Sequence, residues 1–449
     1  MEEKKEDIKP TKKKLSKAGR IILILIGIMV VFVLVAIALY QVPAIQKKFY
    51  PYVTIYRSKI VYFFKPPAKS VFEPSTNSTM DASVIANLTA MAPTATAIPE
   101  PTQTPNPTES TEQATPVVEE SPTPLPTDIP PRVVLEGIVQ EYQNFNSCGP
   151  ANLKLAMSYW GWKGGFEDIE RIIKPGWRDR NVSITEMLYY VQEHTDYDAV
   201  LRYGGEVDLA RQLIAAGFPV LVERGYTHEV DWMGHYGVLD AYDDESQTFH
   251  IPDTNHGNLR IKYEQLQEGW DQFAGAYLVI FNPEDKATVL HILGEQADPD
   301  FNYNYTLNKY QAKLEVAEAH EKYFVLFNLG ELLNMKKQYV EAATMFDEAF
   351  KNYGWLPVEA RPWRMIWYQF GPYESYYYTG RYEDVVSLAY KAVTDADEPA
   401  LPETFLWSGR ANVKLGNTGT AIFEFRRALQ WHPRWEPAIA ELEALGEKP

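Results

Sequence analysis

The stretch from Gln143 to Trp160 constrains this chain most, because it holds the only cysteine among 449 residues. Pro150 suits the first turn of a helix, where its missing N–H would have no helical partner. The apolar residues that follow recur at the spacing of one buried helical face: Leu153, Ala156, Met157 and Trp160. We therefore expect Cys148 at the start of a buried helix.

Cys148 has two interpretations. A helix N-terminus stabilises a thiolate, which is the nucleophilic form of cysteine. The side-chain amide of Gln143 lies five residues upstream and is a candidate donor to an oxyanion near the sulfur. A free cysteine is also often only a small buried hydrophobic residue. The Gly-Pro that follows Cys148, together with polar residues found downstream, favours the nucleophile.

The N-terminal residues 1–20 are rich in lysine, and an uncharged run from Ile21 to Tyr40 follows them. That length is about what a bilayer-spanning helix needs. The basic flank predicts a single-pass transmembrane helix at 21–40, a cytoplasmic tail at 1–20 and extracytoplasmic domains beyond the span. A cleaved signal peptide with the sequence Ala36-Ile37-Ala38 at its cleavage site is the alternative, and the length of the apolar run disfavours it. Residues 41–91 are expected to be a juxtamembrane segment.

Residues 92–131 are dense in proline and threonine. Such a segment cannot bury enough apolar surface to fold, so we expect a disordered linker that acts as an extended spacer. Asn77 and Asn87 lie in glycosylation sequons, which matter only in a host that glycosylates them. The formal net charge of the chain is −17, and beyond the N-terminal tail nothing basic suggests nucleic-acid binding.

Residues 133–283 have the composition of a globular domain. Ser183 and Glu186 form a capping-box pattern that begins a helix reaching about His194. Two further helices are expected at 206–216, closed by a glycine, and at 263–269. The expected strands are 219–223, 235–242, 248–251 and 276–281. Helices followed by an antiparallel meander predict an α+β fold.

His235 begins one expected strand, and Asp253 follows another. A cysteine nucleophile needs a base, and the base needs an acceptor that orients it. If the two strands are neighbours, both side chains lie near one edge of the sheet. A histidine at a strand end is often only a hydrogen-bonding residue, and an aspartate after a strand often forms a turn. Spacing alone leaves rivals for both roles: His228, His250, His256, Asp240 and Asn255.

Residues 137–282 resemble the C39-like peptidases of the papain-like superfamily. The segments that carry the resemblance are Gln143, Cys148-Gly149-Pro150-Ala151, Gly234-His235-Tyr236-Gly237 and Ile251-Pro252-Asp253. The resemblance implies a papain-like α+β cysteine peptidase domain. It implies Cys148 as the nucleophile, His235 as the general base, Asp253 as its orienting partner and Gln143 as the oxyanion-hole residue. The family often has Asp-Pro at the last motif, whereas here Pro252 precedes Asp253 and Thr254 follows it, so Asn255 stays a rival to Asp253.

Residues 305–446 resemble all-α tetratricopeptide (TPR-like) helical repeats. Small and large residues recur there at the offsets of that repeat: Gly330, Ala342, Phe346 and Ala349, then Gly409, Ala421, Phe425, Ala428 and Pro433. The unit between them is irregular, because Gly371-Pro372 should break its first helix. Stacked helix pairs commonly form a concave surface that binds peptides or proteins. The aromatic residues of region 305–446 either line such a groove or pack the core between helices. They are Trp363, Trp367, Tyr368, Phe370 and Tyr376–Tyr378.

These patterns together predict a membrane-anchored extracytoplasmic cysteine peptidase that cleaves peptide bonds, with repeats that bind its substrate or a protein partner. No cofactor, metal or nucleic acid is expected. The alternative is a non-catalytic interaction scaffold in which the repeats carry the function. No second spacer separates peptidase and repeats, so we expect them to pack directly against each other. We also expect a chain cut after Asn282 to keep its turnover of short peptides while losing activity on its natural substrate.

Overall fold

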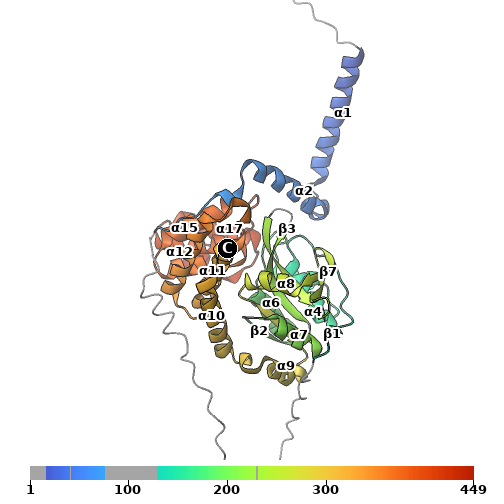
Figure 1. The fold of residues 1–449 in the computed structure, drawn as a ribbon. Coiled ribbons are helices and arrows are strands. Elements are labelled where there is room, and N and C mark those ends of the chain that lie inside the picture. The colour runs from blue at the N-terminus through green and yellow to red at the C-terminus, as the bar shows by residue number, and fades with distance from the viewer. Residues whose placement is uncertain (1–16, 41, 76–128, 229–230) are drawn as a thin grey trace, which may run out of the picture. The chain divides into compact units, whose positions relative to one another are not determined.

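The structure is a computed structural model that describes residues 17–40, 42–75, 129–228 and 231–449. Most of the predicted tail, the two sequons and nearly all of the predicted linker at 92–131 lie outside the described residues. The chain divides into two units, Met1–Phe64 and Lys65–Pro449. Figure 1 traces the chain from the blue N-terminal helices to the red C-terminal ones.

The first unit contains α1 (Lys17–Tyr40) and α2 (Pro43–Phe64). The second of these helices, α2, carries Arg57 and Lys59. Among the residues that the structure describes, no helix combines the length and the apolar character that a membrane crossing requires. This finding contradicts the predicted transmembrane helix at 21–40, and with it the predicted single-pass topology and extracytoplasmic location.

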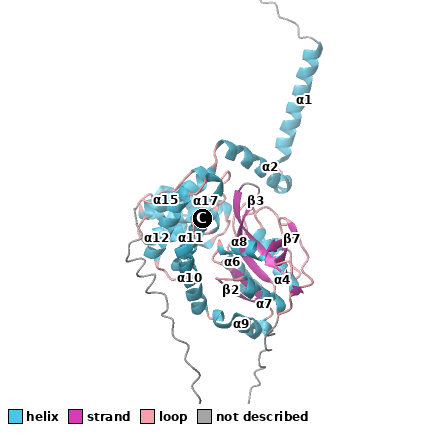
Figure 2. Ribbon diagram, in the orientation of Figure 1, coloured by secondary structure: helices cyan, strands magenta, loops and turns pink. Residues whose placement is uncertain are grey.

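Residues 129–281 form an α+β domain with two antiparallel four-stranded sheets (Figure 2). The first sheet has the order β1 (Arg132–Val134), β5 (Ala241–Asp243), β6 (Thr248–Asp253) and β7 (Gly257–Lys262). The second has the order β2 (Asp198–Arg202), β8 (Tyr277–Phe281), β3 (Val220–His228) and β4 (Asp231–Leu239). The single strand expected at 235–242 is therefore two strands, because the chain leaves the second sheet at Asp240 and enters the first. A single meander was the wrong topology.

Five helices belong to this domain: α4 (Cys148–Tyr159), α5 (Phe166–Ile173), α6 (Ile184–His194), α7 (Val207–Ala215) and α8 (Tyr263–Asp271). The capping box of α6 is confirmed. Ser183 Oγ accepts from the Glu186 N–H at 3.2 Å, and the Glu186 carboxylate accepts from the Ser183 N–H at 2.7 Å. Gly217 follows α7 with a φ of 93°, a conformation that glycine adopts without strain.

The second sheet is buried on both faces. Val220 and Val222 of β3 and Val279 of β8 point into one core cluster with α7. Leu221 and Leu278, which alternate with them, belong to a different cluster with α4 and α6. Successive strand side chains point to opposite faces, so a strand covered on both sides is apolar at every position, as all five buried residues of β8 are. This arrangement packs α4 firmly against the sheet that carries β4.

Helices form the rest of the second unit: α9 (Lys286–Leu293), α10 (Pro299–Val316), α11 (Ala319–Met335), α12 (Tyr339–Trp355), α13 (Met365–Tyr368), α14 (Gly371–Tyr378), α15 (Tyr382–Asp395), α16 (Pro402–Lys414), α17 (Thr418–Trp431) and α18 (Glu436–Ala444). Gly330 of α11 contacts Phe346 of α12 so closely that a Cβ there would lie 2.6 Å from the ring. Gly409 and Phe425 repeat this contact between α16 and α17, at 2.4 Å. Trp363, Trp367 and Tyr376 are buried, so these three pack the core.

The helical region packs directly against the α+β domain. Arg180 of the domain donates to the Asp397 carboxylate at 2.8 Å and to the Glu398 carbonyl. In the other direction, Arg364 of the helical region donates to the Trp232 carbonyl at 3.0 Å. The Trp232 ring lies 5.6 Å from the Phe324 ring, centroid to centroid. The two regions therefore share polar and aromatic contacts.

Candidate active site

The structure places Cys148 at the first residue of α4, as the sequence predicted, and leaves its side chain partly exposed. The turn before the helix includes Asn146, with a φ of 54°, and the buried Ser147, whose carbonyl accepts from the Ala151 N–H at 3.0 Å. A helix N-terminus carries partial positive charge, which stabilises an anion at that point. The position therefore suits a reactive thiolate.

His235 lies in the middle of β4, not at its start, and only 4% of it is exposed. Its Nε2 lies 3.1 Å from Oδ2 of Asp253, and the ring also hydrogen bonds Cys148. Because Asp253 occupies Nε2, Nδ1 is the ring nitrogen that remains to exchange a proton with the thiol. Burial alone would lower the pKa of His235. The hydrogen bonds to Asp253 and Cys148 outweigh burial and raise this pKa to about 9.

Asp253 ends β6 and is fully buried. Its Oδ1 accepts the backbone N–H groups of Asn255 at 2.8 Å and His256 at 2.9 Å, and its Oδ2 accepts from Arg224 Nη2 at 3.3 Å. Burial would raise the pKa of Asp253, but the hydrogen bond from His235 and these donors hold it well below its usual value. Asp253 is therefore a carboxylate that orients the histidine, while Asn255 contributes a backbone N–H to it.

The rival histidines have other partners. Nδ1 of His250 pairs with Asp240 at 2.7 Å, and Nε2 of His256 lies 3.2 Å from the Tyr226 hydroxyl. The side chain of His228 lies outside the described residues. Among the described histidines, the hydrogen bond to Cys148 comes from His235.

Gln143 lies in the segment before α4, against the residue that follows Asp253. The Gln143 N–H donates to the Thr254 carbonyl at 2.8 Å, and the Thr254 hydroxyl donates to Gln143 Oε1 at 2.7 Å. Because Oε1 is occupied, Nε2 is the end of the amide that remains to donate to a substrate. This orientation fits the predicted oxyanion donor.

Sequence reasoning missed several side chains around these four. Arg224 of β3 stands opposite His235 in the strand register, and Tyr226 lies 5.6 Å from the His235 ring, centroid to centroid. Tyr368 reaches the site from the helical region and contacts Gly234, where a Cβ would lie 3.2 Å from its ring. Burial and the nearby charge of Cys148 raise the pKa of Tyr368. No local pattern predicts these contacts, because each joins segments that are distant in sequence.

A buried carboxyl lies behind the site. Glu223 stands opposite Tyr236 in the register of β3 and β4, and the two side chains are hydrogen bonded. The Tyr236 hydroxyl donates its single proton to the Val182 carbonyl at 3.0 Å. Burial raises the pKa of Glu223 to about 8, and this effect outweighs the interaction with Tyr236, which lowers the pKa.

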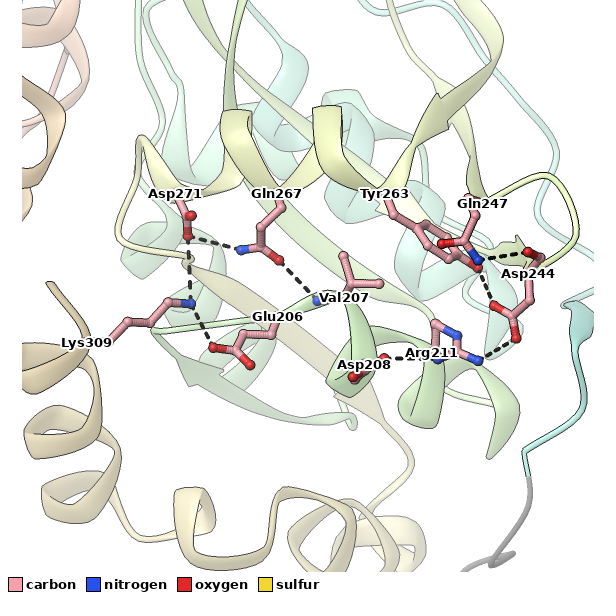
Figure 3. A pocket seen from close by; sticks show the side chains of 10 residues that line it. All are labelled: Glu206, Val207, Asp208, Arg211, Asp244, Gln247, Tyr263, Gln267, Asp271 and Lys309. Atoms are coloured by element: carbon pink, nitrogen blue, oxygen red, sulfur yellow. Dashed lines mark hydrogen bonds and ion pairs between the residues drawn. The ribbon is translucent and has the colours of Figure 1, made fainter. Parts of the chain in front are cut away.

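A polar cleft of about 650 Å³ lies elsewhere, between α7, α8 and α10 (Figure 3). Its cations already have anionic partners: Lys309 lies 3.1 Å from Glu206, and Arg211 pairs with Asp208 and Asp244. Both cations are thus paired within the protein, and none of the four predicted site residues lines the cleft. In the described part of the chain, no group of three or more His, Cys, Asp or Glu side chains is arranged to hold a metal ion.

Comparison with known proteins found a family match and similar solved structures. Residues 129–281 match the Peptidase_C39 like family. We call them the C39-like domain. Two solved structures resemble the chain: a protein described as a C39-like peptidase from Bacillus anthracis, and a double glycine motif protease from an AMS/PCAT transporter in complex with the leader peptide. Their identities to this chain are 14% and 18%, and their TM-scores are 0.27 and 0.25. Each alignment covers 33% of this chain, and 97% and 96% of the respective structures. No curated protein matches the sequence.

Proposed function

We propose that this protein is a cysteine peptidase that hydrolyses peptide bonds through Cys148, His235, Asp253 and Gln143. The observations that carry the proposal are a buried imidazole 3.1 Å from the Asp253 carboxylate and a cysteine at the start of α4 whose thiol interacts with that imidazole and raises its pKa. A nucleophile, a base and a group that orients the base constitute the minimal apparatus of covalent acyl transfer. The match of residues 129–281 to the C39-like family independently implies a peptide substrate.

The proposed reaction has two stages. The Cys148 thiolate attacks the carbonyl carbon of the scissile bond, and Gln143 Nε2 donates to the oxygen that becomes negatively charged. The His235 imidazolium then gives its proton to the leaving nitrogen, which departs as an amine and leaves a thioester on Cys148. In the second stage His235 takes a proton from water, the resulting hydroxide attacks the thioester, and the carboxylic acid product leaves the regenerated thiolate.

We further propose that α11–α12, α14–α15 and α16–α17 act as TPR-like helix pairs that bind the substrate or a partner protein. The glycine–phenylalanine contacts of Gly330 with Phe346 and of Gly409 with Phe425 support this reading, because they repeat at equivalent points of two pairs. Repeat stacks of this kind bind extended ligands along one face.

The test is labelling with a thiol-reactive peptidase probe, followed by hydrolysis of a peptide library. Cys148→Ala should abolish labelling and hydrolysis. His235→Ala should abolish hydrolysis, and Gln143→Ala should lower kcat on the order of a hundredfold or more, as the loss of one oxyanion donor does. His250→Ala is the matched control, since it removes a histidine paired with another aspartate, and it should keep wild-type activity.

Two outcomes would contradict the proposal. If His235→Ala kept wild-type activity, another group would be the base. If the wild-type chain neither reacted with the probe nor cleaved any peptide, the non-catalytic scaffold would replace the enzyme as the better interpretation.

A further inference from the structure

We propose that Asn152 and Thr254 are positioning residues that hold the Gln143 amide with its N–H end toward the reacting carbonyl. The inference rests on the proposed peptidase function and adds to it two residues that do not touch the substrate. Two side-chain hydrogen bonds carry it, one between Asn152 and Thr254 and one from Thr254 to Gln143.

Asn152 connects the elements that carry the proposed catalytic groups. It lies on α4, one turn after Cys148, and is fully buried. Its Nδ2 lies 2.9 Å from the Cys148 carbonyl, 3.1 Å from the Tyr236 carbonyl and 3.1 Å from Thr254 Oγ1. Tyr236 is the neighbour of His235 in sequence, and Thr254 is the neighbour of Asp253. One amide group therefore fixes the helix start and the two strands relative to one another.

The direction of the hydrogen bonds follows from what each atom can do. Asn152 Nδ2 can only donate, so Thr254 Oγ1 is an acceptor toward it, and the two protons of Nδ2 are shared among three acceptors. The one hydroxyl proton of Thr254 is then directed to Gln143 Oε1, at 2.7 Å. An amide whose oxygen end is fixed presents its nitrogen end on the other side. The reversed amide would instead place an oxygen opposite the developing oxyanion, which would repel it.

Thr254 also holds the backbone of Gln143. The Gln143 N–H donates to the Thr254 carbonyl at 2.8 Å, so backbone and side chain of one residue both contact Thr254. Thr254 is fully buried. A buried hydroxyl is costly unless it is hydrogen bonded, and here its proton is donated to Gln143. Thr254 stands at the place where this sequence departs from the Asp-Pro pattern, and a proline there would have no hydroxyl to donate.

The experiment is a double-mutant cycle on kcat. Thr254→Val keeps the volume of the side chain and removes the hydroxyl, and we expect it to lower kcat about tenfold, the effect of one buried hydrogen bond. KM for a short peptide should change less than twofold. Thr254→Ser should restore kcat to within threefold of wild type. In the Gln143→Ala background, Thr254→Val should have no further effect, because the group that it positions is gone. Thr248→Val, at another buried threonine of the C39-like domain, is the control and should leave kcat unchanged.

Equal losses from Thr254→Val in both backgrounds would overturn the inference, and so would a serine variant as slow as the valine variant. These results would leave the proposed function intact as long as hydrolysis still depended on Cys148. If the wild-type chain had no peptidase activity, the proposed function would fail, and the midpoint of urea unfolding would test the hydrogen bond instead. The midpoint shift caused by Thr254→Val should then be smaller in the Gln143→Ala background, and an additive shift would refute the contact.

Discussion

Replacing Asp253 with asparagine should move the alkaline limit of peptidase activity to lower pH, by up to about two units. Asp253 supplies the charge that keeps His235 protonated, since burial by itself would lower the pKa of that imidazole. An asparagine has the same shape and keeps an oxygen that can accept from Arg224, but it carries no charge. The change therefore removes the electrostatic interaction and preserves the contact.

The magnitude follows from the pKa of His235. Its value of about 9 exceeds the ordinary 6.5 of histidine, and the difference corresponds to about 3 kcal/mol of interaction with the charged form. Without the carboxylate, burial still lowers the pKa and Cys148 still raises it, so the pKa should fall from about 9 toward 6.5. At pH 8 the protonated fraction of His235 would then fall by up to roughly thirtyfold, and His235 must be protonated to release the leaving amine.

The assay is kcat/KM for one peptide measured from pH 5.5 to 10 with the wild-type protein and the Asp253→Asn variant. The wild-type profile should decline near pH 9, and the variant profile should decline at a clearly lower pH. Asp240→Asn, which changes the partner of His250, should leave the wild-type profile in place. An Asp253→Asn profile with the same alkaline limb as the wild type would refute the pairing of Asp253 with the catalytic base.

Two further predictions concern stability. Arg180→Ala should lower the unfolding free energy by about 1.5–3 kcal/mol, because it removes a cation that hydrogen bonds the buried Asp397 carboxylate. Arg171→Ala, at an exposed ion pair, should change it by less than about 0.5 kcal/mol, and similar losses in urea unfolding of both variants would contradict the buried interface. Glu223→Gln should flatten the pH dependence of stability. The folded-state pKa of Glu223, about 8, lies above the unfolded value of 4.5, so its stabilisation is complete below pH 4.5 and is lost as the pH rises to 8, by up to about 5 kcal/mol. The glutamine variant should therefore be the more stable protein at pH 9, and a wild type of equal stability there would mean that Glu223 is already ionised in the fold.

The sequence predicted the features that local chemistry determines. A Ser-x-x-Glu pattern satisfies two helix-end donors wherever the fold places it, so the start of α6 was predicted correctly. The helix that begins at Cys148 was also predictable, because Pro150 and the apolar residues that follow it lie within about three helical turns. Both features depend on residues that are close in the chain.

The features that the sequence did not predict depend on contacts between segments that are distant in the chain. The prediction of a single meander was wrong because the mostly apolar run from His235 to Tyr242 does not indicate that the chain changes sheets at Asp240. The strand β7 was missed because it has charged residues on its exposed side. In the sequence, Asn152 resembles any polar residue in a helix. Its contacts with the Cys148 carbonyl, the Tyr236 carbonyl and Thr254 form only when the chain is folded. The predicted membrane span relied on a single run of apolar residues, and the structure does not bear it out.

The structure also changes the expected effect of cutting the chain after Asn282. The sequence suggested that the helical region serves only a natural substrate, so that short peptides would still be cleaved. In the structure, Arg364 donates to the Trp232 carbonyl at 3.0 Å, and Tyr368 contacts Gly234, the residue before His235. Removing the helices would therefore expose the buried Trp232 ring and free the strand that carries the base.

We accordingly expect the shortened chain to have a lower unfolding temperature and a lower kcat for short peptides as well. The single variant Arg364→Ala should reduce kcat in the same direction and by a smaller factor, because it removes one of these contacts and keeps the others. Wild-type turnover of a short peptide by the shortened chain would mean that the geometry of β4 is set within the C39-like domain alone. Since the proposed mechanism requires His235 to lie close to both Cys148 and Asp253, even a small displacement of β4 would separate the three groups and lower kcat.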